Sequence, residues 1–263
     1  MTPRQANITG LLFSIVAAAI VGAVLLLVVK PSMAAEPCTE VLGFSQTGEW
    51  YGSFELVVVN SEWQRRIKGG MDINLWGNPD SEAWRVSVAS RCPGPATRAL
   101  LTVSDSRIES NPQVWADLID RAITAILDPR NLPDVAEVIV QAVVGGPRNG
   151  LCQFNGRDVR ASVNHSVIDQ AIALVVANHS ADVKVTAGFS PEVENCNQYR
   201  DQPGHLTPIG AAAVGEIIGA FYAAGFIPPA PDPDPDPGPL VCEPGCKVIT
   251  SRISGRPFCR CRR

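Results

Sequence analysis

Histidine is scarce in this sequence, with three histidines among 263 residues. No set of metal ligands is evident in the central part of the chain, so we expect neither a metal nor another cofactor. The net charge of −4 argues against a chain that binds nucleic acid along its length. His165 and His179 lie on or at the end of a predicted helix, where we expect both rings to face solvent. His205 is left as the candidate for acid–base chemistry.

Charge is absent from residues 8–29, a run of 22 residues rich in aliphatic side chains. The run is long enough to span a bilayer. Ser32-Met33-Ala34 resembles a cleavage site, so residues 1–36 are interpreted as either a secretory signal peptide or an uncleaved membrane anchor. In both cases we expect the main domain, residues 37–227, to lie outside the cytoplasm, secreted or held at the membrane through residues 8–29.

Eight cysteines all follow the apolar run, and an even number of cysteines in an exported chain indicates disulfides. Cys38 and Cys92 each precede an expected strand, so both lie near the amino ends of strands. Cys152 and Cys196 both lie near the carboxyl ends. We therefore predict the pairs Cys38–Cys92 and Cys152–Cys196.

Proline alternates with aspartate in much of residues 228–240, which predicts an extended polyproline spacer between the main domain and the tail, residues 241–263. The tail is too short to bury a core and has to be held by cross-links. From Cys242 onward it has six Lys or Arg residues and a single Glu, so it is either simply solvated or a partner for an anionic surface. Its four cysteines favour disulfides over zinc, with the connectivity open: Cys242, Cys246, Cys259 and Cys261.

Segments typical of strands and helices alternate through the main domain. Expected strands are residues 40–44, 71–76, 98–103, 136–144 and 183–187. Expected helices are residues 114–127, 163–178 and 208–224. Periodicity does not decide between helix and strand for residues 50–66. This alternation predicts an α/β domain with a mostly parallel sheet.

A serine and a histidine stand at the ends of two of these elements. Ser45 follows Gly43-Phe44 at the carboxyl end of the first expected strand, where ligands bind in open α/β sheets. His205 stands just before a helix that has good start signals. Thr207 is a suitable N-cap, and Pro208 suits the first helical position.

Four stretches together resemble the sequence blocks of SGNH hydrolases, the GDSL esterase superfamily, nearest the sialate O-acetylesterase-like branch. They are, in chain order, Gly43-Phe44-Ser45-Gln46, the Gly77 stretch from Trp76 to Trp84, Thr102-Val103-Ser104-Asp105, and His205 to Gly210. The resemblance covers roughly the main domain. It implies a three-layer α/β/α sandwich of the flavodoxin-like type and no cofactor.

The resemblance also implies roles for individual residues. Ser45 would be the nucleophile and His205 its base, with Asp201 orienting the imidazole. The oxyanion would be bound by the N–H groups of Ser45 and Gly77 and by the hydroxyl of Ser104. The family places its acid three residues before the histidine, whereas Asp201 stands four before it. A serine–histidine dyad or the use of Glu194 therefore stays open.

These features lead to an exported, monomeric serine esterase that hydrolyses a small ester. The resemblance implies an acetylated glycan as the substrate. A second interpretation stays open, in which the altered first and third blocks mark a catalytically inactive binding or structural module at the cell surface.

Overall fold

The computed structural model describes residues 38–59, 62–88, 91–179 and 184–224, together with the backbone of residues 246–250 and 257–261. The apolar run at residues 8–29 and the spacer at residues 228–240 lie outside the described residues, and so do the side chains of the tail cysteines. None of the helices within the described ranges is long and apolar enough to cross a membrane. The tail contributes two strands that pair antiparallel, β8 (Cys246–Thr250) and β9 (Pro257–Cys261).

The main domain is built on a five-stranded sheet in the order β2-β1-β3-β4-β7, with every neighbouring pair parallel. The strands are β1 (Thr39–Gly43), β2 (Trp63–Ile67), β3 (Arg98–Val103), β4 (Glu137–Ala142) and β7 (Lys184–Ala187). In chain order this is the flavodoxin-like arrangement, whose direction of winding reverses between the first and third strands. The predicted α/β class is confirmed. The loops that follow β1 and β3 start at the carboxyl ends of the strands, where ligands bind in such folds.

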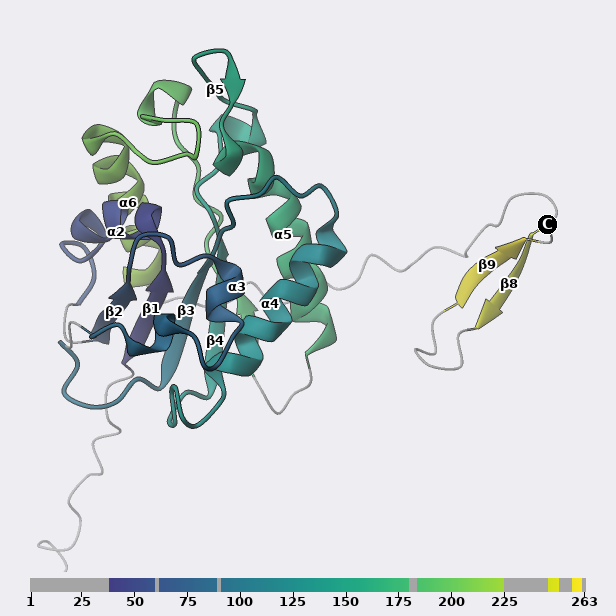
Figure 1. Cartoon of the computed structure of the whole chain (residues 1–263), viewed down its shortest axis with the longest axis horizontal. Coiled ribbons are helices and arrows are strands. Elements are labelled where there is room, and N and C mark those ends of the chain that lie inside the picture. Colours follow the sequence, from purple (N-terminus) through teal and green to yellow (C-terminus); the bar gives the residue numbers. More distant parts are fainter. Residues whose placement is uncertain are drawn as a thin grey trace, which may run out of the picture. The chain divides into compact units, whose positions relative to one another are not determined.

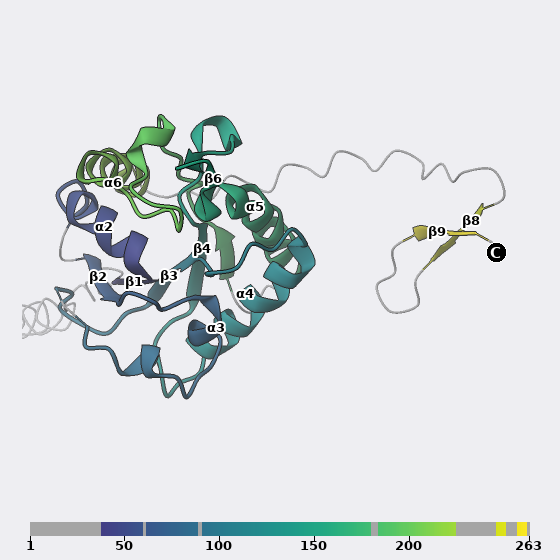
Figure 2. The same cartoon turned by 45° about the horizontal axis from the view of Figure 1, so that its top comes forward.

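Two layers of helices cover the sheet (Figures 1 and 2). On one face α2 packs against α6, and on the other α4 packs against α5. The helices are α2 (Ser45–Phe54), α3 (Ile73–Trp76), α4 (Pro112–Ile126), α5 (Arg160–Asn178) and α6 (Pro208–Ala223). The smaller elements include the 3₁₀ turns Glu82–Arg85, Pro147–Asn149 and Cys196–Gln198, and a short antiparallel pair, β5 (Gln153–Phe154) with β6 (Arg157–Asp158).

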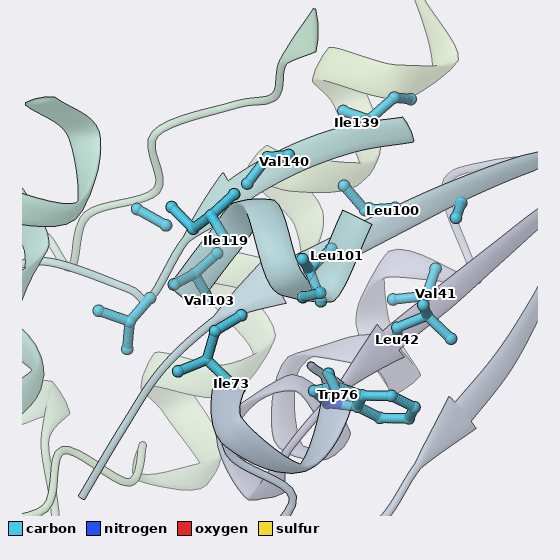
Figure 3. Packing of buried hydrophobic residues seen from close by; sticks show 14 of the residues in the cluster. Val41, Leu42, Ile73, Trp76, Leu100, Leu101, Val103, Ile119, Ile139 and Val140 are labelled. Carbon is cyan, nitrogen blue, oxygen red and sulfur yellow. The ribbon is translucent and has the colours of Figure 1, made fainter. Parts of the chain in front are cut away.

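The central strands are buried on both faces, which explains their nearly continuous apolar sequences. Every residue of β1 is buried, and so is every residue of β3 after Arg98. Figure 3 shows side chains from β1, β3 and β4 in one cluster with Ile73 and Trp76 of α3 and Ile119 of α4. A sheet packed in this way is a rigid base for the loops that follow its strands.

The main domain has two disulfides among the described residues, and they join the cysteines that we expect from the sequence. Cys38–Cys92 connects the residue before β1 to the segment before β3, with 5.8 Å between the Cα atoms. Cys152–Cys196 connects the loop after β4 to the turn that precedes the Asp201–His205 loop, with 5.3 Å between the Cα atoms. Each bond closes a long loop, and such cross-links stabilise a domain by about 2–4 kcal/mol.

The prediction of a strand at residues 71–76 is wrong, because this segment contains the short helix α3. The carboxylate of Asp72 accepts hydrogen bonds from the N–H groups of Asn74 and Leu75, at 3.0 and 3.3 Å, and thereby starts the helix. The second strand is instead β2, in the segment whose periodicity was ambiguous. That segment contains the second half of helix α2 as well as most of β2.

Helix α6 lies very close to α2 because it presents glycine at the contact. A Cβ atom on Gly215 would overlap the carbonyl oxygen of Trp50 and lie 2.8 Å from Ser53 Cβ. A Cβ atom on Gly52, on the exposed side of α2, would have no atom within 4 Å. The two glycines therefore differ in packing although both lie in helices of the same layer.

Gly215→Ala is expected to lower the free energy of unfolding by about 1–3 kcal/mol, because the added methyl group overpacks the contact between α2 and α6. Gly52→Ala is the matched control and is expected to raise that free energy by about 0.5–1 kcal/mol, because alanine has less backbone entropy to lose in a helix. Urea unfolding of the full chain measures both changes. A similar rise in both variants would contradict the close packing.

Candidate active site

Ser45 is the first residue of α2, directly after a tight turn from β1. Gly43 allows this turn, since a Cβ atom there would overlap the side chain of Thr47. The Thr47 hydroxyl lies 2.6 Å from the Thr102 hydroxyl, which donates to the Leu42 carbonyl at 3.0 Å. The contacts of Thr102 thus fix the turn that presents Ser45.

His205 is held by a loop that folds around the carboxylate of Asp201. Asp201 Oδ1 accepts hydrogen bonds from the N–H groups of Gly204, at 3.1 Å, and His205, at 2.9 Å. Gly204 has φ +103°, a conformation that favours glycine, and its missing Cβ leaves room for the side chain of Ala161. The loop ends at Thr207, whose hydroxyl accepts from the Gly210 N–H at 3.1 Å as the predicted N-cap of α6.

The structure brings Ser45, His205 and Asp201 into one chain of hydrogen bonds. Ser45 Oγ lies 2.7 Å from His205 Nε2, and His205 Nδ1 lies 2.6 Å from Asp201 Oδ2. The extra residue in the loop therefore does not prevent the contact, and the imidazole has its carboxylate without Glu194. A serine, a base and an orienting acid in this sequence of contacts form the geometry of nucleophilic acyl transfer.

The charge of Asp201 is set by its hydrogen bonds. Partial burial alone would raise the pKa of this carboxyl group. The backbone N–H groups of His205 and Gly204 and the His205 ring outweigh burial and hold the pKa of Asp201 below its ordinary value. Asp201 is therefore ionised at neutral pH. An ionised carboxylate only accepts hydrogen bonds, so in the neutral imidazole Nδ1 of His205 carries the proton and Nε2 accepts one from Ser45.

Two further side chains of α2 tie the serine to the histidine loop. Gln46 is buried, and its amide donates to the Gly204 carbonyl at 2.7 Å while its oxygen accepts the Val144 N–H at 2.9 Å. Glu49 accepts the Leu206 N–H at 2.7 Å and pairs with Arg200 at 2.6 Å. Sequence reasoning missed both residues. The sequence signal for Glu49 is its spacing of four residues from Ser45, because residues four apart lie on the same side of a helix.

The prediction that the Gly77 N–H is an oxyanion donor is wrong. Gly77 ends α3, and its N–H already donates to the Ile73 carbonyl at 2.9 Å, beside Arg121 and away from Ser45. The error follows from the error about α3, because the glycines after the true second strand, β2, are Gly69 and Gly70. Gly70 lines the same cleft as Ser45, and its N–H has no hydrogen-bond partner among the described residues.

A cleft of about 330 Å³ lies over the serine and the histidine. Its lining includes Ser45, His205, Gly70, Ser104, Asp72 and Arg160. Ser104, whose hydroxyl the resemblance implies as an oxyanion donor, lines this cleft, and its side chain makes no hydrogen bond with any described residue. No group of three His, Cys, Asp or Glu side chains within the described ranges is placed to hold a metal ion.

The carboxylate of Asp105, which also borders the cleft, is paired with Arg107. Burial would raise the pKa of its carboxyl group, but hydrogen bonds from Arg107, at 2.8–3.0 Å, and from Asn74, at 2.9 Å, hold that pKa below its ordinary value. Asp105 is therefore an anion that already has its donors. It fixes the loop after β3 against α3 and is not free to act as a base.

The expectation that His165 faces solvent is wrong. Its side chain is 1% exposed, with Nδ1 2.6 Å from the Val143 carbonyl and Nε2 3.0 Å from Ser190 Oγ. The ring is satisfied by partners that are distant in sequence, so its helical position alone could not reveal its burial. His165 fixes the chain just after β4 and does not line the cleft.

The comparisons with known proteins show similarity in fold only. No protein-family model matches the sequence. No curated protein matches it either. A family two carbohydrate esterase from Clostridium thermocellum, solved in complex with cellohexaose, is similar with a TM-score of 0.43 and 10% identity over 71% of this chain and 63% of that chain.

Two further solved structures are similar at the same level. A carbohydrate acetylesterase from Sinorhizobium meliloti has a TM-score of 0.42 and 14% identity over 72% of this chain and 100% of that chain. A family two carbohydrate esterase from Cellvibrio japonicus has a TM-score of 0.42 and 14% identity over 72% of this chain and 61% of that chain. The chain thus spans less than two thirds of the length of these two family two esterases.

Glu49→Ala is expected to loosen the histidine loop, because it removes the acceptor for the Leu206 N–H and the partner of Arg200. Losing hydrogen bonds of this kind costs about 1–3 kcal/mol locally, so amide exchange of residues 200–207 is expected to accelerate about ten- to a hundredfold. Hydrogen–deuterium exchange with mass spectrometry measures this rate. Glu216→Ala, an exposed glutamate on α6, is the control. Unchanged exchange at residues 200–207 in Glu49→Ala would refute the role of Glu49.

Proposed function

We propose that this chain is a serine esterase of the SGNH type, with Ser45 as the nucleophile, His205 as the base and Asp201 as the orienting acid. The observation that carries the proposal is the continuous chain of short hydrogen bonds from Ser45 Oγ through the imidazole to Asp201, at the floor of an open cleft. The four sequence blocks that resemble SGNH hydrolases support it, because three of the four lie around this cleft.

The reaction would proceed through a covalent acyl-enzyme. Ser45 Oγ attacks the ester carbonyl while His205 Nε2 takes the hydroxyl proton, and the ionised Asp201 stabilises the resulting imidazolium. Collapse of the tetrahedral intermediate expels the alcohol, which receives the proton from Nε2. A water molecule then gives its proton to Nε2 and attacks the acyl-enzyme. Release of the acid restores the Ser45 hydroxyl.

Three groups would stabilise the oxyanion of the tetrahedral intermediate. They are the N–H of Ser45 at the start of α2, the N–H of Gly70 and the hydroxyl of Ser104. Gly70 takes the role that the sequence assigned to Gly77, because Gly70 lines the cleft and has an unused N–H. The helix dipole of α2 adds to the effect, since the amino terminus of a helix carries partial positive charge. One such donor is worth about 3 kcal/mol in the transition state.

The substrate proposed is a small ester, specifically an O-acetyl group on a glycan, and the site of action is outside the cytoplasm. The resemblance to the sialate O-acetylesterase-like branch supports the acetyl group. Two disulfides support export, because such bonds persist in oxidising compartments. The apolar run at residues 8–29 supports either secretion or a membrane anchor.

Hydrolysis of p-nitrophenyl acetate by the purified full chain tests the proposal. Ser45→Ala is expected to reduce hydrolysis to the background rate. Asp201→Asn keeps the size of the side chain but removes its charge, so kcat is expected to fall about 10³–10⁴-fold. Asp134→Asn changes an exposed aspartate outside the cleft and is the control, with unchanged kcat.

Equal rates for the wild-type chain and Ser45→Ala would contradict the proposal, provided that both are folded by circular dichroism. A folded wild-type chain that hydrolyses no ester would instead favour the non-catalytic cell-surface module.

A further inference from the structure

A short apolar loop, residues 56–59, follows helix α2. Leu56 is 83% exposed, and Val57 and Val59 are exposed as well. Eight large apolar side chains are exposed in the described ranges, and three of them lie in these four residues, whereas the other five are spread over other loops and helices. Single exposed apolar residues are common on soluble proteins, but a contiguous group marks a contact surface.

The apolar loop lies at the amino edge of the sheet, where the chain enters the domain. All strands are parallel and α2 follows β1, so α2 runs back to the amino edge before β2 begins at Trp63. Cys38 directly precedes β1 at the same edge and is bonded to Cys92. Its carbonyl accepts the N–H groups of Thr97 and Arg98 at 2.9 and 3.1 Å. The entry point of the chain is therefore fixed to the edge that carries the apolar loop.

The proposed active site occupies the opposite edge of the sheet. Ser45 follows β1 and Ser104 follows β3, and both line the cleft at the carboxyl ends of these strands. A surface that covers the apolar loop therefore leaves the cleft open on the far side of the domain.

The sequence before Cys38 indicates what covers the apolar loop. The uncharged run at residues 8–29 is long enough to span a bilayer. Eight residues, 30–37, connect this run to Cys38, and eight residues reach at most about 28 Å. A domain of this size is about 40 Å across. If residues 8–29 lie in a bilayer, the connection is too short for the carboxyl edge to face the lipid, and the amino edge stays beside it.

We propose that the apolar loop docks into the lipid bilayer that holds residues 8–29, so that the cleft opens away from the membrane. The inference takes residues 8–29 as an anchor, and it does not depend on the esterase function. Apolar side chains of this kind enter the boundary between head groups and acyl chains. Glu55, beside the loop, is paired with Arg91 at 3.3 Å. Glu62, just after the loop, has no ion-pair partner among the described residues, which favours zwitterionic over anionic lipids.

Photo-crosslinking in phosphatidylcholine vesicles tests the proposal. The full chain is reconstituted with a benzophenone side chain at the loop, Leu56→p-benzoylphenylalanine, and mass spectrometry of its peptides locates lipid adducts after irradiation. Leu151→p-benzoylphenylalanine is the matched control, because Leu151 is 64% exposed and follows β4 at the carboxyl edge. Lipid adducts are expected at position 56 and not at position 151.

A polar substitution within the loop tests its apolar character. The benzophenone is placed in Val59→p-benzoylphenylalanine, and Leu56→Ser is added to the same chain. The adduct yield at position 59 is expected to fall, by up to about tenfold, because the apolar area of Leu56 no longer leaves water. Leu151→Ser in the same chain is the control and is expected to leave the yield unchanged.

The outcomes separate this inference from the proposed function. A chain that stays with the vesicles but gives no adduct at position 56, or equal adducts at positions 56 and 151, overturns the docking. A chain that does not stay with the vesicles also overturns it, because the anchor is then missing. Hydrolysis of p-nitrophenyl acetate by the same preparations reports the esterase separately, so adducts at position 56 without hydrolysis support the docking while the esterase function fails.

Discussion

The hydrogen bond between Ser45 Oγ and His205 Nε2 joins two segments that are 160 residues apart in the sequence. The surrounding structure holds these segments in register. Gln46 binds the Gly204 carbonyl and Glu49 binds the Leu206 N–H, so the first five residues of α2 contact the residues on both sides of the histidine. The sheet supplies a rigid base for Ser45, which directly follows the central strand β1 and Phe44. Helix α6 begins just after the histidine loop and packs against α2.

The loop that carries His205 shows how a departure in sequence is accommodated by local geometry. Asp201 stands one residue further from the histidine than in the SGNH pattern, yet one of its oxygens accepts two backbone N–H groups of the loop while the other binds the imidazole. Gly204 supplies the left-handed turn that makes this possible. The same hydrogen bonds that fold the loop therefore keep Asp201 charged and orient the ring.

Sequence patterns predicted the fold well where the signal was local or repeated. Four of the five expected strands, the N-cap at Thr207 and both disulfides of the main domain are present. The failures concern features that depend on single side chains or distant partners. The carboxylate of Asp72 starts helix α3 where a strand was expected, and Gly70, not Gly77, lines the cleft with Ser45. The roles of Gln46 and Glu49 appear only when the far end of the chain is in place.

Labelling with a fluorophosphonate tests the central assignment of Ser45 most directly, because this reagent forms a stable adduct with a serine that a neighbouring base activates. The full chain is treated at neutral pH, and intact mass and peptide mapping locate the adduct. One adduct on Ser45 that is absent from Ser45→Ala is the expected result. A folded chain that takes up no label, or that is labelled at another serine such as Ser190, which lies 3.0 Å from His165 Nε2, would contradict it.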